Sequence, residues 1–530
     1  MFARLNVLRQ YCLLSGRTAN FFQWTKDSTQ IKYFFSSSVP HSTIFALSSG
    51  AGKCGVAVIR LSGSKSSYAL KQLCGKVTKP RTASLCKLMN PQTQELLDRA
   101  LVLWFPGPKS FTGEDCAELH IHGGPAVVSA VLTALGSLSG LTPALPGEFS
   151  KRAFANGKLD LTEVEGLGDL IHAETEAQRK QALRQMEGDL NQLYTGWRTG
   201  LIKSLANVEA FIDFSEEENI EDDVIELVTT SVMKIQTEME AHLRDSRKGE
   251  RLRDGVHAVI LGEPNVGKSS LLNFLCQRPA AIVSPLAGTT RDVVETALNI
   301  AGYPVLISDT AGLRESCDVI EKEGISRALD RAEKADLKIL VLDFEVHGAN
   351  LSNVDFPTFL SSYLSDMRLY QNNFREADSV HDSPSNSDQS LSFDQVPEDS
   401  WEVLVVVNKS DLARVSDLKQ VSQHASGSVC FVSCKTGQGL DRFLHVLAGR
   451  IKDLCGDPLT SSSSLTQTRH RHHLSRCKQH LEDFHNLLSY DVVIAAEKLR
   501  RATRELALIT GAVSTEDVLD VIFRDFCIGK

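Results

Sequence analysis

The chain has 530 residues and a formal net charge of −9, with 42% apolar and 23% charged residues. These values are typical of a globular protein of about three or four domains, and no apolar run approaches the roughly 18 residues that a membrane span requires. Because the net charge is negative, any contact with nucleic acid would depend on a local basic patch. The cysteines lack C-x-x-C and zinc-finger spacing, which favours a reducing compartment and argues against a structural zinc site.

Residues 1–40 differ in composition from the rest of the chain. They contain five basic residues, one acidic residue and a run of three serines. Such an N-terminus is typical of a mitochondrial transit peptide, and it lacks the compact apolar core of a secretory signal. The alternative is a disordered N-terminal arm. We expect a transit peptide over residues 1–40 and a location in the mitochondrial matrix.

Residues 41–155 have the pattern of a mixed α/β domain. The segments TIFALSS, CGVAVIRLSG, RALVLWF and AELHIHGG predict strands, and AVVSAVLTALGSL predicts a helix over residues 126–138. From residue 156 to 250, apolar residues recur at helical spacing with polar faces between them. The first part of a helical domain is therefore expected there.

Residues 251–452 alternate short apolar runs with helical patterns, which predicts a parallel sheet. The candidate buried strands are HAVILG, VLISD, LKILVLDF, EVLVVVNK and GSVCFVSC. Residues 365–400 are rich in Ser, Asp and Asn, and we interpret them as a disordered surface insertion. Apart from a serine-rich linker at residues 460–467, residues 453–530 have helical patterns again.

A phosphate-binding loop is predicted at Gly262–Ser270, GEPNVGKSS, between the strand HAVIL and the helix SLLNFL. Glycines in such a loop let backbone N–H groups surround phosphates at the N-terminus of a helix. Lys268 is then placed to bridge the outer phosphates, and the hydroxyl of Ser269 is placed to ligate Mg²⁺.

Four further motifs follow in the order expected of a GTPase, each at a strand end: GTTRD at 288–292, DTAG at 309–312, NKSD at 408–411 and SCK at 433–435. Thr290 offers a second Mg²⁺ ligand, and Asp309 can hold the ion through water. The carboxylate of Asp411 can accept two N–H bonds from guanine, a pairing that adenine cannot reproduce. The predicted GTP-binding residues are Gly262, Asn265, Val266, Gly267, Lys268, Ser269, Ser270, Thr289, Thr290, Asp309, Thr310, Ala311, Gly312, Asn408, Lys409, Asp411, Ser433, Cys434 and Lys435.

The hydrolysis step needs a group that DTAG does not supply. Ras-like proteins have a glutamine beside this motif that positions the attacking water, and here Leu313 stands in that place. An aliphatic side chain cannot orient water. Another group must do so, and another positive charge must act where an arginine finger would.

From residue 43 to 530, apart from the insertion, the sequence resembles the MnmE/TrmE family of tRNA-modification GTPases in its mitochondrial form. The resemblance rests on GEPNVGKSS, AGTTRD, DTAGLRE, PGEFSKRAFANGKLDL, GEDCAELHIHGG and FCIGK, the last three of which generic GTPases lack. It implies an α/β fold in three parts. These are an N-terminal folate-binding domain resembling one-carbon enzymes, a helical domain built from two chain segments, and an inserted P-loop GTPase domain.

For GTP hydrolysis, the resemblance implies a homodimer whose GTPase domains meet across the nucleotide, with K⁺ in place of the arginine finger. The residues that match the family's potassium ligands are Asn265, Ser284, Leu286 and Thr289. Glu321 matches the carboxylate that orients water in the family. Without the resemblance, Glu321 would be interpreted as a solvated helix residue.

For the N-terminal domain, the resemblance implies binding of 5-formyltetrahydrofolate or a related one-carbon folate. The matching residues are Arg60, Glu118, Lys158 and Lys530. A carboxylate can accept paired N–H bonds from a pterin edge, and basic groups can meet folate carboxylates. From the residues alone, surface charges at Arg60 and Lys158 and a strand-edge salt bridge at Glu118 are the simpler interpretation.

The chain ends in FCIGK, which does not fit a prenylation box because Gly529 and Lys530 depart from that pattern. The resemblance implies instead that the C-terminus returns to the N-terminal domain, with Cys527 toward the one-carbon group and Lys530 toward the folate. We predict Glu321, Lys268 and Cys527 as catalytic residues. A buried or idle cysteine is the alternative for Cys527.

The segment RHRHHLSRCK at residues 469–478 begins a predicted C-terminal helix. We reject a metal site at its histidines, because no carboxylate or cysteine partner lies at ligand spacing. A solvated helix start is the favoured interpretation. Contact with tRNA phosphates is the functional alternative, since basic side chains supply affinity that does not depend on sequence.

Together with the resemblance, these features predict a GTP-hydrolysing enzyme that acts with an MnmG-like FAD protein on mitochondrial tRNA. It would install a 5-taurinomethyl (carboxymethylaminomethyl-type) group on the wobble uridine, using a folate one-carbon donor. One alternative is a GTPase switch in mitochondrial ribosome assembly, resembling Era, although Era-like chains carry a small RNA-binding domain after the GTPase. The other is a folate enzyme of aminomethyl transfer with a regulatory GTPase inserted.

Overall fold

The computed structural model describes residues 42–214, 223–244, 247–277, 295–309, 334–347, 403–413, 429–458 and 465–513, together with 519, 522, 523, 526 and 529. The predicted transit peptide and the 365–400 insertion lie outside these residues. Among the described helices, none is long and apolar enough to cross a bilayer. The cysteines in the described part of the chain are all free thiols.

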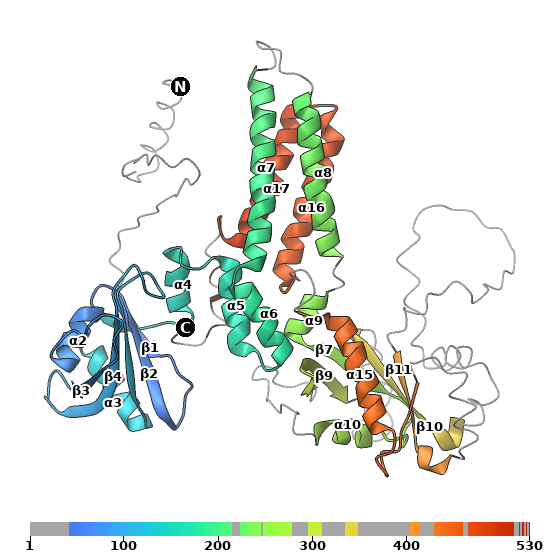
Figure 1. Cartoon of the computed structure of the whole chain (residues 1–530), viewed down its shortest axis with the longest axis horizontal. Coiled ribbons are helices and arrows are strands. Elements are labelled where there is room, and N and C mark those ends of the chain that lie inside the picture. Colours follow the sequence, from blue (N-terminus) through green and yellow to red (C-terminus); the bar gives the residue numbers. More distant parts are fainter. Residues whose placement is uncertain are drawn as a thin grey trace, which may run out of the picture. The chain divides into compact units, whose positions relative to one another are not determined.

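A six-stranded sheet forms the N-terminal part of the described chain (Figure 1). Its order is β3-β4-β5-β2-β1-β6, and all neighbours are antiparallel except β1 and β6. The strands are β1 (Thr43–Leu47), β2 (Cys54–Ser62), β3 (Ser84–Met89), β4 (Leu96–Phe105), β5 (Cys116–Gly123) and β6 (Leu141–Pro143). Helices α2 (Ser66–Cys74) and α3 (Pro125–Gly136) pack on one face and share its apolar core.

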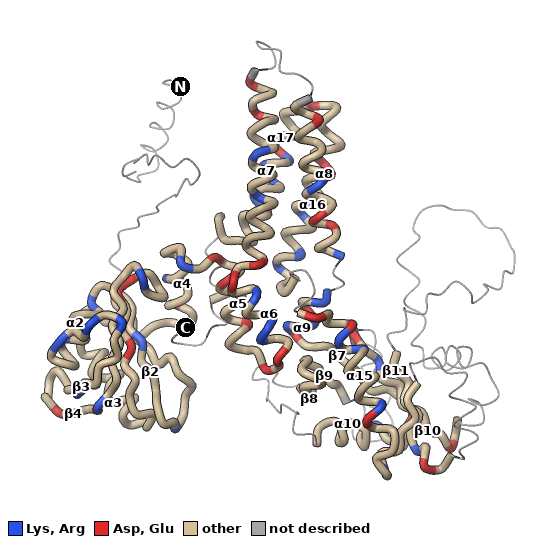
Figure 2. Tube along the Cα trace, viewed as in Figure 1, with Lys and Arg blue, Asp and Glu red and all other residues tan. Residues whose placement is uncertain are grey.

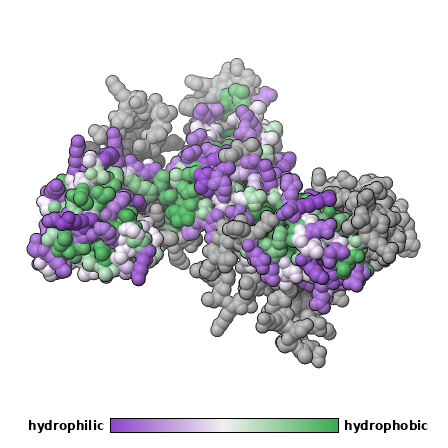
Figure 3. Space-filling view, turned by 60° about the horizontal axis from the view of Figure 1, so that its bottom comes forward, coloured by the Kyte–Doolittle hydropathy of each residue, from purple (hydrophilic) through white to green (hydrophobic). Residues whose placement is uncertain are grey.

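The other face of this sheet carries polar residues because side chains alternate along a strand. In β2, Ile59 and Leu61 are buried in the core, so Arg60 between them points to the opposite face. In β5, Glu118 precedes the buried Leu119 and follows the buried Ala117. Apolar side chains are also exposed in this part of the molecule, and Figure 3 shows green surface among the purple there.

Three helices follow the N-terminal sheet: α4 (Glu148–Ala155), α5 (Leu161–His172) and α6 (Glu176–Met186). Capping boxes fix the start of the last two. The Asp160 side chain accepts from the Glu163 backbone while the Glu163 side chain accepts from the Asp160 backbone, and Thr175 and Gln178 do the same for α6. Both boxes satisfy N–H groups that a helix start leaves without partners.

A helical bundle combines two distant chain segments (Figure 1). Its helices are α7 (Asp189–Phe214), α8 (Asp223–Leu243), α16 (Thr468–Leu488) and α17 (Val492–Thr510). They share one apolar core in which Tyr194 from α7, Val232 from α8, Phe484 from α16 and Leu506 from α17 are fully buried. The prediction of a helical domain built from both sides of the inserted segment is confirmed.

A second six-stranded sheet has the order β12-β11-β10-β7-β9-β8. Its strands are β7 (Val256–Leu261), β8 (Glu295–Ile300), β9 (Tyr303–Asp309), β10 (Leu337–Asp343), β11 (Val403–Asn408) and β12 (Val429–Phe431). Helices α10 (Lys268–Cys276) and α15 (Leu440–Cys455) contribute to its core, and the short α9 (Lys248–Asp254) precedes it.

The five predicted strands form a parallel sheet, as expected, and the structure adds the edge strand β8, which runs antiparallel to β9. Only Ala301 and Gly302 join the two strands, and both have positive φ, 53° and 91°. Such a two-residue turn twists as the strands do and can only return the chain antiparallel. The sequence analysis did not identify this strand.

The first basic residues of α16, Arg469, His470 and Arg471, are buried or half-buried against acidic partners, so the interpretation as a solvated helix start is wrong for them. Arg469 donates through Nε (3.2 Å) and Nη2 (2.9 Å) to Oε1 of Glu165 in α5. His470 is fully buried, and its Nε2 lies 2.7 Å from Oε2 of the same carboxylate. Arg469 also donates to the carbonyls of Leu508 and Ile509 at the end of α17.

Other residues of the segment also have acidic partners. Arg471 donates to Glu250 in α9 (Nε to Oε1, 2.8 Å), and His473 contacts Glu505 in α17 (Nδ1 to Oε2, 2.8 Å). Figure 2 shows basic and acidic positions gathered around α5, α6 and α9. These partners lie far apart in the sequence, and the basic residues hold them together. Arg469, Arg471 and His473 thus use, for contacts within the protein, side chains that the tRNA-binding alternative would have directed to phosphates.

The bundle core contains a histidine that should make stability depend on pH. His242 lies in α8, and its Nε2 is 3.1 Å from the hydroxyl of Tyr194. Burial, with smaller contributions from the charges of His470 and Arg471, lowers the pKa of His242 from 6.5 to about 4. The unfolded chain therefore takes up a proton below about pH 6.5 that the folded chain refuses. The free energy of unfolding falls as the pH falls toward 4.

We expect His242→Gln to remove about 2 kcal/mol of the stability loss between pH 7.5 and pH 5. Glutamine keeps an acceptor for the Tyr194 hydroxyl and does not titrate. Urea unfolding of both chains at the two pH values, followed by tryptophan fluorescence, measures the difference. Equal pH dependence in the two chains would contradict the assignment of a neutral buried His242.

Candidate functional site

The predicted phosphate loop joins β7 to α10 in a backbone conformation that demands glycine. Gly262 (φ 147°) and Gly267 (φ 104°) have positive φ, as does Asn265 (φ 64°) between them. A Cβ on Gly262 would lie 2.3 Å from the carbonyl oxygen of Val341, and a Cβ on Gly267 would lie 2.1 Å from Nδ2 of Asn408. Only glycine allows this close approach of the loop to the ends of β10 and β11.

The loop presents its polar groups at its exposed side. Lys268 begins α10, and its Nζ donates to the carbonyls of Gly262 (2.9 Å) and Glu263 (2.7 Å). Val266 anchors the loop in the core, while Ser269 and Ser270 are exposed at the first turn of the helix. An ammonium over the loop and N–H groups at a helix start form the arrangement that binds the phosphates of a nucleotide.

Asn408 at the end of β11 braces the loop from the other side. Its Nδ2 donates to the carbonyl of Val266 (2.8 Å), and its Oδ1 accepts from the backbone N–H of Cys434 (3.1 Å). Both ends of the amide are thus used within the protein, and the side chain is buried. The sequence predicted Asn408 as a GTP-binding residue, and the structure gives it the role of joining the phosphate loop to the segment 433–435.

Asp411 lies beside this brace with its carboxylate exposed. The hydroxyl of Ser433 donates to its Oδ1 (2.7 Å), and this hydrogen bond, more than any other contact, lowers the pKa of Asp411. Ser433 is held in turn by the backbone N–H of Thr436 (3.2 Å). Lys409 (φ 61°) contacts Oδ2 of Asp343 at 2.5 Å. An ionised, oriented carboxylate of this kind can accept the paired N–H groups of guanine.

The remaining predicted residues of the nucleotide site lie outside the described residues, except for the backbone of Asp309, which ends β9. They are Ser284, Leu286, Thr289, Thr290, Thr310, Ala311, Gly312 and Glu321. The described part therefore brings together the phosphate loop, the helix that follows it and the base-side segments. These are the groups that GTP needs for its phosphates and its base.

In the N-terminal sheet, Arg60 and Glu118 are directly opposite each other on β2 and β5. Arg60 donates through Nε (3.2 Å) and Nη2 (3.1 Å) to Oε1 of Glu118, whose Oε2 lies 3.3 Å from Nε2 of His120. About a fifth of each partner's side chain is exposed, 18% for Arg60 and 20% for Glu118. The salt bridge considered for Glu118 is present, and its partner is another predicted folate residue.

Two aromatic rings pack against the guanidinium of Arg60 in this ion pair. The Arg60 guanidinium lies 5.3 Å from the ring centroid of Phe111 and 5.9 Å from that of Phe149. These contacts favour a fixed guanidinium plane. Lys158 is exposed and lies close to the loop that carries Phe111. A Cβ added to Gly113 of this loop would be 3.3 Å from Cε of Lys158. The sequence did not reveal the two rings, since single aromatic residues carry no such signal.

The C-terminal residues that the structure describes pack against the N-terminal half of the chain. A Cβ on Gly147 would lie 2.4 Å from the carbonyl oxygen of Phe523, and one on Gly168 would lie 3.2 Å from the Phe526 ring.

The last described residue, Gly529 (φ 95°), lies against β1. Its carbonyl accepts from the Ser48 hydroxyl (2.8 Å), and a Cβ on it would lie 2.2 Å from the Leu47 carbonyl oxygen. The C-terminus thus returns to the N-terminal sheet. Cys527 and Lys530, which flank Gly529 in the predicted site, lie outside the described residues.

Two family models match the chain. Residues 43–158 match the GTP-binding protein TrmE N-terminus, and residues 161–527 match the MnmE helical domain. The G domain of the T. maritima FeoB iron transporter is a similar solved structure, with 24% identity over 38% of this chain and 98% of that chain, but its TM-score of 0.22 supports no structural argument.

Full-length relatives are closer. The chain is 53% identical to the Danio rerio protein named 5-taurinomethyluridine-[tRNA] synthase subunit GTPB3, mitochondrial, over 95% of this chain and 96% of that one. It is 50% identical to the Homo sapiens protein of the same name, over 92% and 93%. It is 48% identical to the tRNA modification GTPase MnmE of Parvibaculum lavamentivorans, over 92% and 100%. This chain therefore belongs to the MnmE/TrmE family of tRNA modification GTPases.

Proposed function

We propose that this chain hydrolyses GTP in the mitochondrial modification of tRNA, where it takes part in adding a 5-taurinomethyl group to the wobble uridine. The observation that carries the proposal is the 53% identity, over 95% of the chain, to a protein named for that synthase activity. The joint presence of a nucleotide site and the Arg60–Glu118 pair in one chain supports it.

In the nucleotide site, we assign Lys268 to the outer phosphates and Asp411 to the guanine base. Ser269 and Thr290 would hold Mg²⁺, which neutralises charge on the phosphates. The exposed Ser269 hydroxyl at the start of α10 fits this role. Asn265, Ser284, Leu286 and Thr289 form the proposed K⁺ set, and Glu321 is the proposed water-orienting base.

Asn265 can serve K⁺ because the loop turns its side chain away from the core. Its exposure and its positive φ of 64° support a position on the outer side of the loop. A cation held there supplies the positive charge that stabilises a developing phosphate charge. We further propose a homodimer in which a second copy of the GTPase domain approaches this side of the loop.

In the N-terminal domain, we assign Arg60, Glu118, Lys158 and Lys530 to a one-carbon folate such as 5-formyltetrahydrofolate. Glu118 offers carboxylate oxygens to a pterin edge, and the basic groups offer N–H donors to folate carboxylates. The position of Gly529 against β1 supports the placement of the C-terminal thiol of Cys527 near this site.

The remaining assignments concern partners and boundaries. We propose an MnmG-like FAD protein as the partner and the mitochondrial matrix as the location, with residues 1–40 as transit peptide. We propose residues 41–155 as the folate-binding domain, 156–250 and 453–530 as the helical domain and 251–452 as the GTPase domain. The matched ranges 43–158 and 161–527 support the division between the first two.

The function is tested by removing the protein from cells and measuring 5-taurinomethyluridine in mitochondrial tRNA by mass spectrometry of nucleosides. We expect the modification to disappear and to return with the wild-type chain but not with Lys268→Ala. An unchanged amount of 5-taurinomethyluridine in cells without the protein would contradict the proposal. Association with a ribosomal subunit only in the GTP state would then favour the ribosome-assembly alternative.

The hydrolysis mechanism is tested on the chain without residues 1–40. We expect GTP turnover to be faster in K⁺ than in Na⁺, and Glu321→Ala to lower kcat about a hundredfold or more because a positioned base is lost. Asn265→Ala should remove the difference between K⁺ and Na⁺ while leaving basal turnover. Equal turnover in both salts with Glu321→Ala unimpaired would leave a GTPase without this mechanism.

A further inference from the structure

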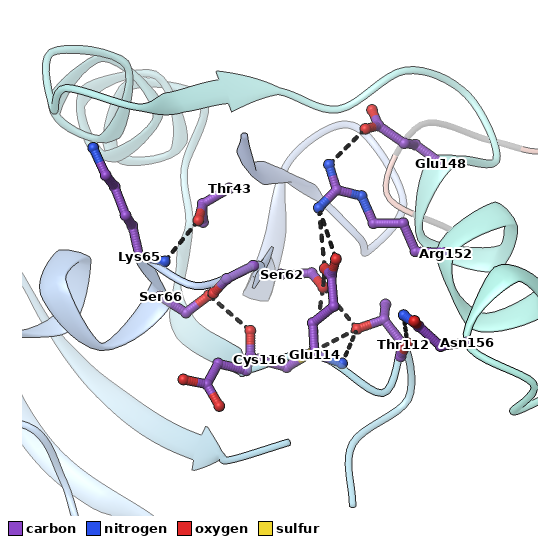
Figure 4. A network of polar contacts seen from close by, with 12 residues as sticks. Thr43, Ser62, Lys65, Ser66, Thr112, Glu114, Cys116, Glu148, Arg152 and Asn156 are labelled. Carbon is purple, nitrogen blue, oxygen red and sulfur yellow. Dashed lines mark hydrogen bonds and ion pairs between the residues drawn. The ribbon is translucent and has the colours of Figure 1, made fainter. Parts of the chain in front are cut away.

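A buried arginine joins α4 to the loop before β5, and these two segments adjoin the proposed folate residues. Arg152 lies in α4, and its side chain is 9% exposed. Its Nη1 donates to both oxygens of Glu114 (3.3 and 3.0 Å), and its Nη2 donates to Oε1 of Glu148 (2.9 Å), as Figure 4 shows. A planar guanidinium can serve two carboxylates at once, whereas a lysine ammonium presents a single point of charge.

Glu114 and its neighbour Thr112 connect the loop before β5 to β2 and to the end of α4. The Ser62 hydroxyl donates to Oε2 of Glu114 (2.6 Å) and lies 2.7 Å from the Thr112 hydroxyl. Thr112 also contacts the thiol of Cys116 (3.1 Å), and its carbonyl accepts from Nδ2 of Asn156 (2.7 Å) (Figure 4). The loop therefore has little freedom while Glu114 remains held.

The two elements that Arg152 joins each supply one of the rings beneath Arg60. Phe111 belongs to the loop and precedes Thr112, while Phe149 belongs to α4 and follows Glu148. The guanidinium of Arg60 lies over both rings and reaches Glu118 from there. A shift of the loop relative to α4 would change the position of the Phe111 ring relative to the Phe149 ring. The guanidinium of Arg60, which packs on both rings, would then tilt.

We propose that Arg152 is a positioning residue for the folate site, acting through the two rings and Arg60. This inference rests on the folate site proposed above and adds to it a residue that does not touch the ligand. α4 also seats the C-terminal segment, because Gly147 at its start packs on the carbonyl of Phe523. Arg152 thus links the loop that carries Phe111 to the helix that contacts the C-terminal segment.

The first test uses Arg152→Lys, which keeps the positive charge but loses the planar guanidinium that serves two carboxylates. We expect the affinity for 5-formyltetrahydrofolate, measured by calorimetry, to fall about tenfold, the effect of one well-placed charged contact. GTP turnover should not change. Amide hydrogen exchange should rise in residues 109–118 and 147–156 and stay constant in the helical bundle.

A matched control is Arg251→Lys in α9. Arg251 is 18% exposed and contacts Asp336 at 2.7 Å, so the same chemical change is made at an ion pair that is also largely shielded from solvent. Its folate affinity should equal that of the wild-type chain. A tenfold loss in this control too would overturn the proposal, since the effect would then be one of general stability.

A double-mutant cycle tests whether Arg152 acts through Arg60. If it does, Arg60→Ala combined with Arg152→Lys should bind folate no more weakly than Arg60→Ala alone. Additive losses, wild-type affinity in Arg152→Lys, or unchanged exchange near α4 would each overturn the proposal. Absence of binding by the wild-type chain would overturn the folate assignment itself, and the positioning role with it.

Discussion

Gly267→Ala is expected to lower the affinity for GTP about a thousandfold or more, because at least two N–H contacts to charged phosphates would be lost. The φ of 104° is one that alanine rarely adopts, and the added Cβ would lie 2.1 Å from Nδ2 of Asn408. The loop must move to relieve this contact. Its N–H groups and the Lys268 ammonium then no longer converge on one phosphate chain.

Fluorescence titration with a labelled GTP analogue measures this effect, and circular dichroism shows whether the chain remains folded. Gly437→Ala is the matched control, since Gly437 also has positive φ (81°) in the same sheet domain but nothing lies within 4 Å of a Cβ there. It should cost about 1 kcal/mol of stability and leave GTP affinity unchanged. GTP affinity within tenfold of wild type in Gly267→Ala would contradict the tight packing of the loop.

The GTPase fold was predictable because its signals are local. Buried parallel strands have the pattern of apolar runs, and the phosphate loop, DTAG, NKSD and SCK each come at or just after the end of such a run. The strand β8 escaped notice because ETALNI is not a continuous apolar run, and its direction is decided by the turn at Ala301 and Gly302. Positive φ at a non-glycine residue is not visible in a sequence.

The candidate sites were predicted residue by residue, but not their contacts. Arg60 and Glu118 are 58 positions apart, and only the pairing of β2 with β5 makes them opposite neighbours. Asn408 and Val266 are 142 positions apart. Sequence motifs indicate which chemistry a residue offers, whereas register and burial decide whether that chemistry is turned toward a ligand or toward another part of the protein.

The basic segment 469–478 shows the limit of interpretation by composition. A run of charges is usually solvated, and that expectation was wrong because the acidic partners are scattered. Glu165 is 304 positions from Arg469, and Glu250 is 221 positions from Arg471. No local pattern indicates such partners. The second six-stranded sheet, β7 to β12, lies in the sequence between Glu250 and Arg471.

Glu165→Ala is expected to lower the free energy of unfolding of the helical domain by about 3–5 kcal/mol, the usual cost of leaving buried charge without its partner. Glu165 is 5% exposed and His470 is fully buried. Burial raises the pKa of Glu165, but the charges and hydrogen bonds of His470 and Arg469 outweigh it, so the pKa is lowered and the carboxylate is ionised. Alanine would leave Arg469 and His470 without this carboxylate as a partner.

Urea unfolding measures the loss, and Glu209→Ala is the matched control. Glu209 in α7 also pairs with an arginine of the C-terminal segment, Arg500 (2.9 Å), but its side chain is 45% exposed. An exposed pair contributes about 0–1 kcal/mol, so the control should be nearly neutral. Similar losses in both variants would show that burial does not distinguish the two contacts.

Glu165→Ala should affect tRNA modification and GTP turnover to different extents. Glu165 lies one helical turn before Asp169 in α5, and Gly168 of that turn packs on Phe526 next to the predicted thiol. Loss of the carboxylate should therefore loosen the seat of the C-terminal segment more than the phosphate loop. We expect tRNA modification in cells to fall further than GTP turnover of the purified protein, and an equal fall in both would argue that α5 does not serve the C-terminal site.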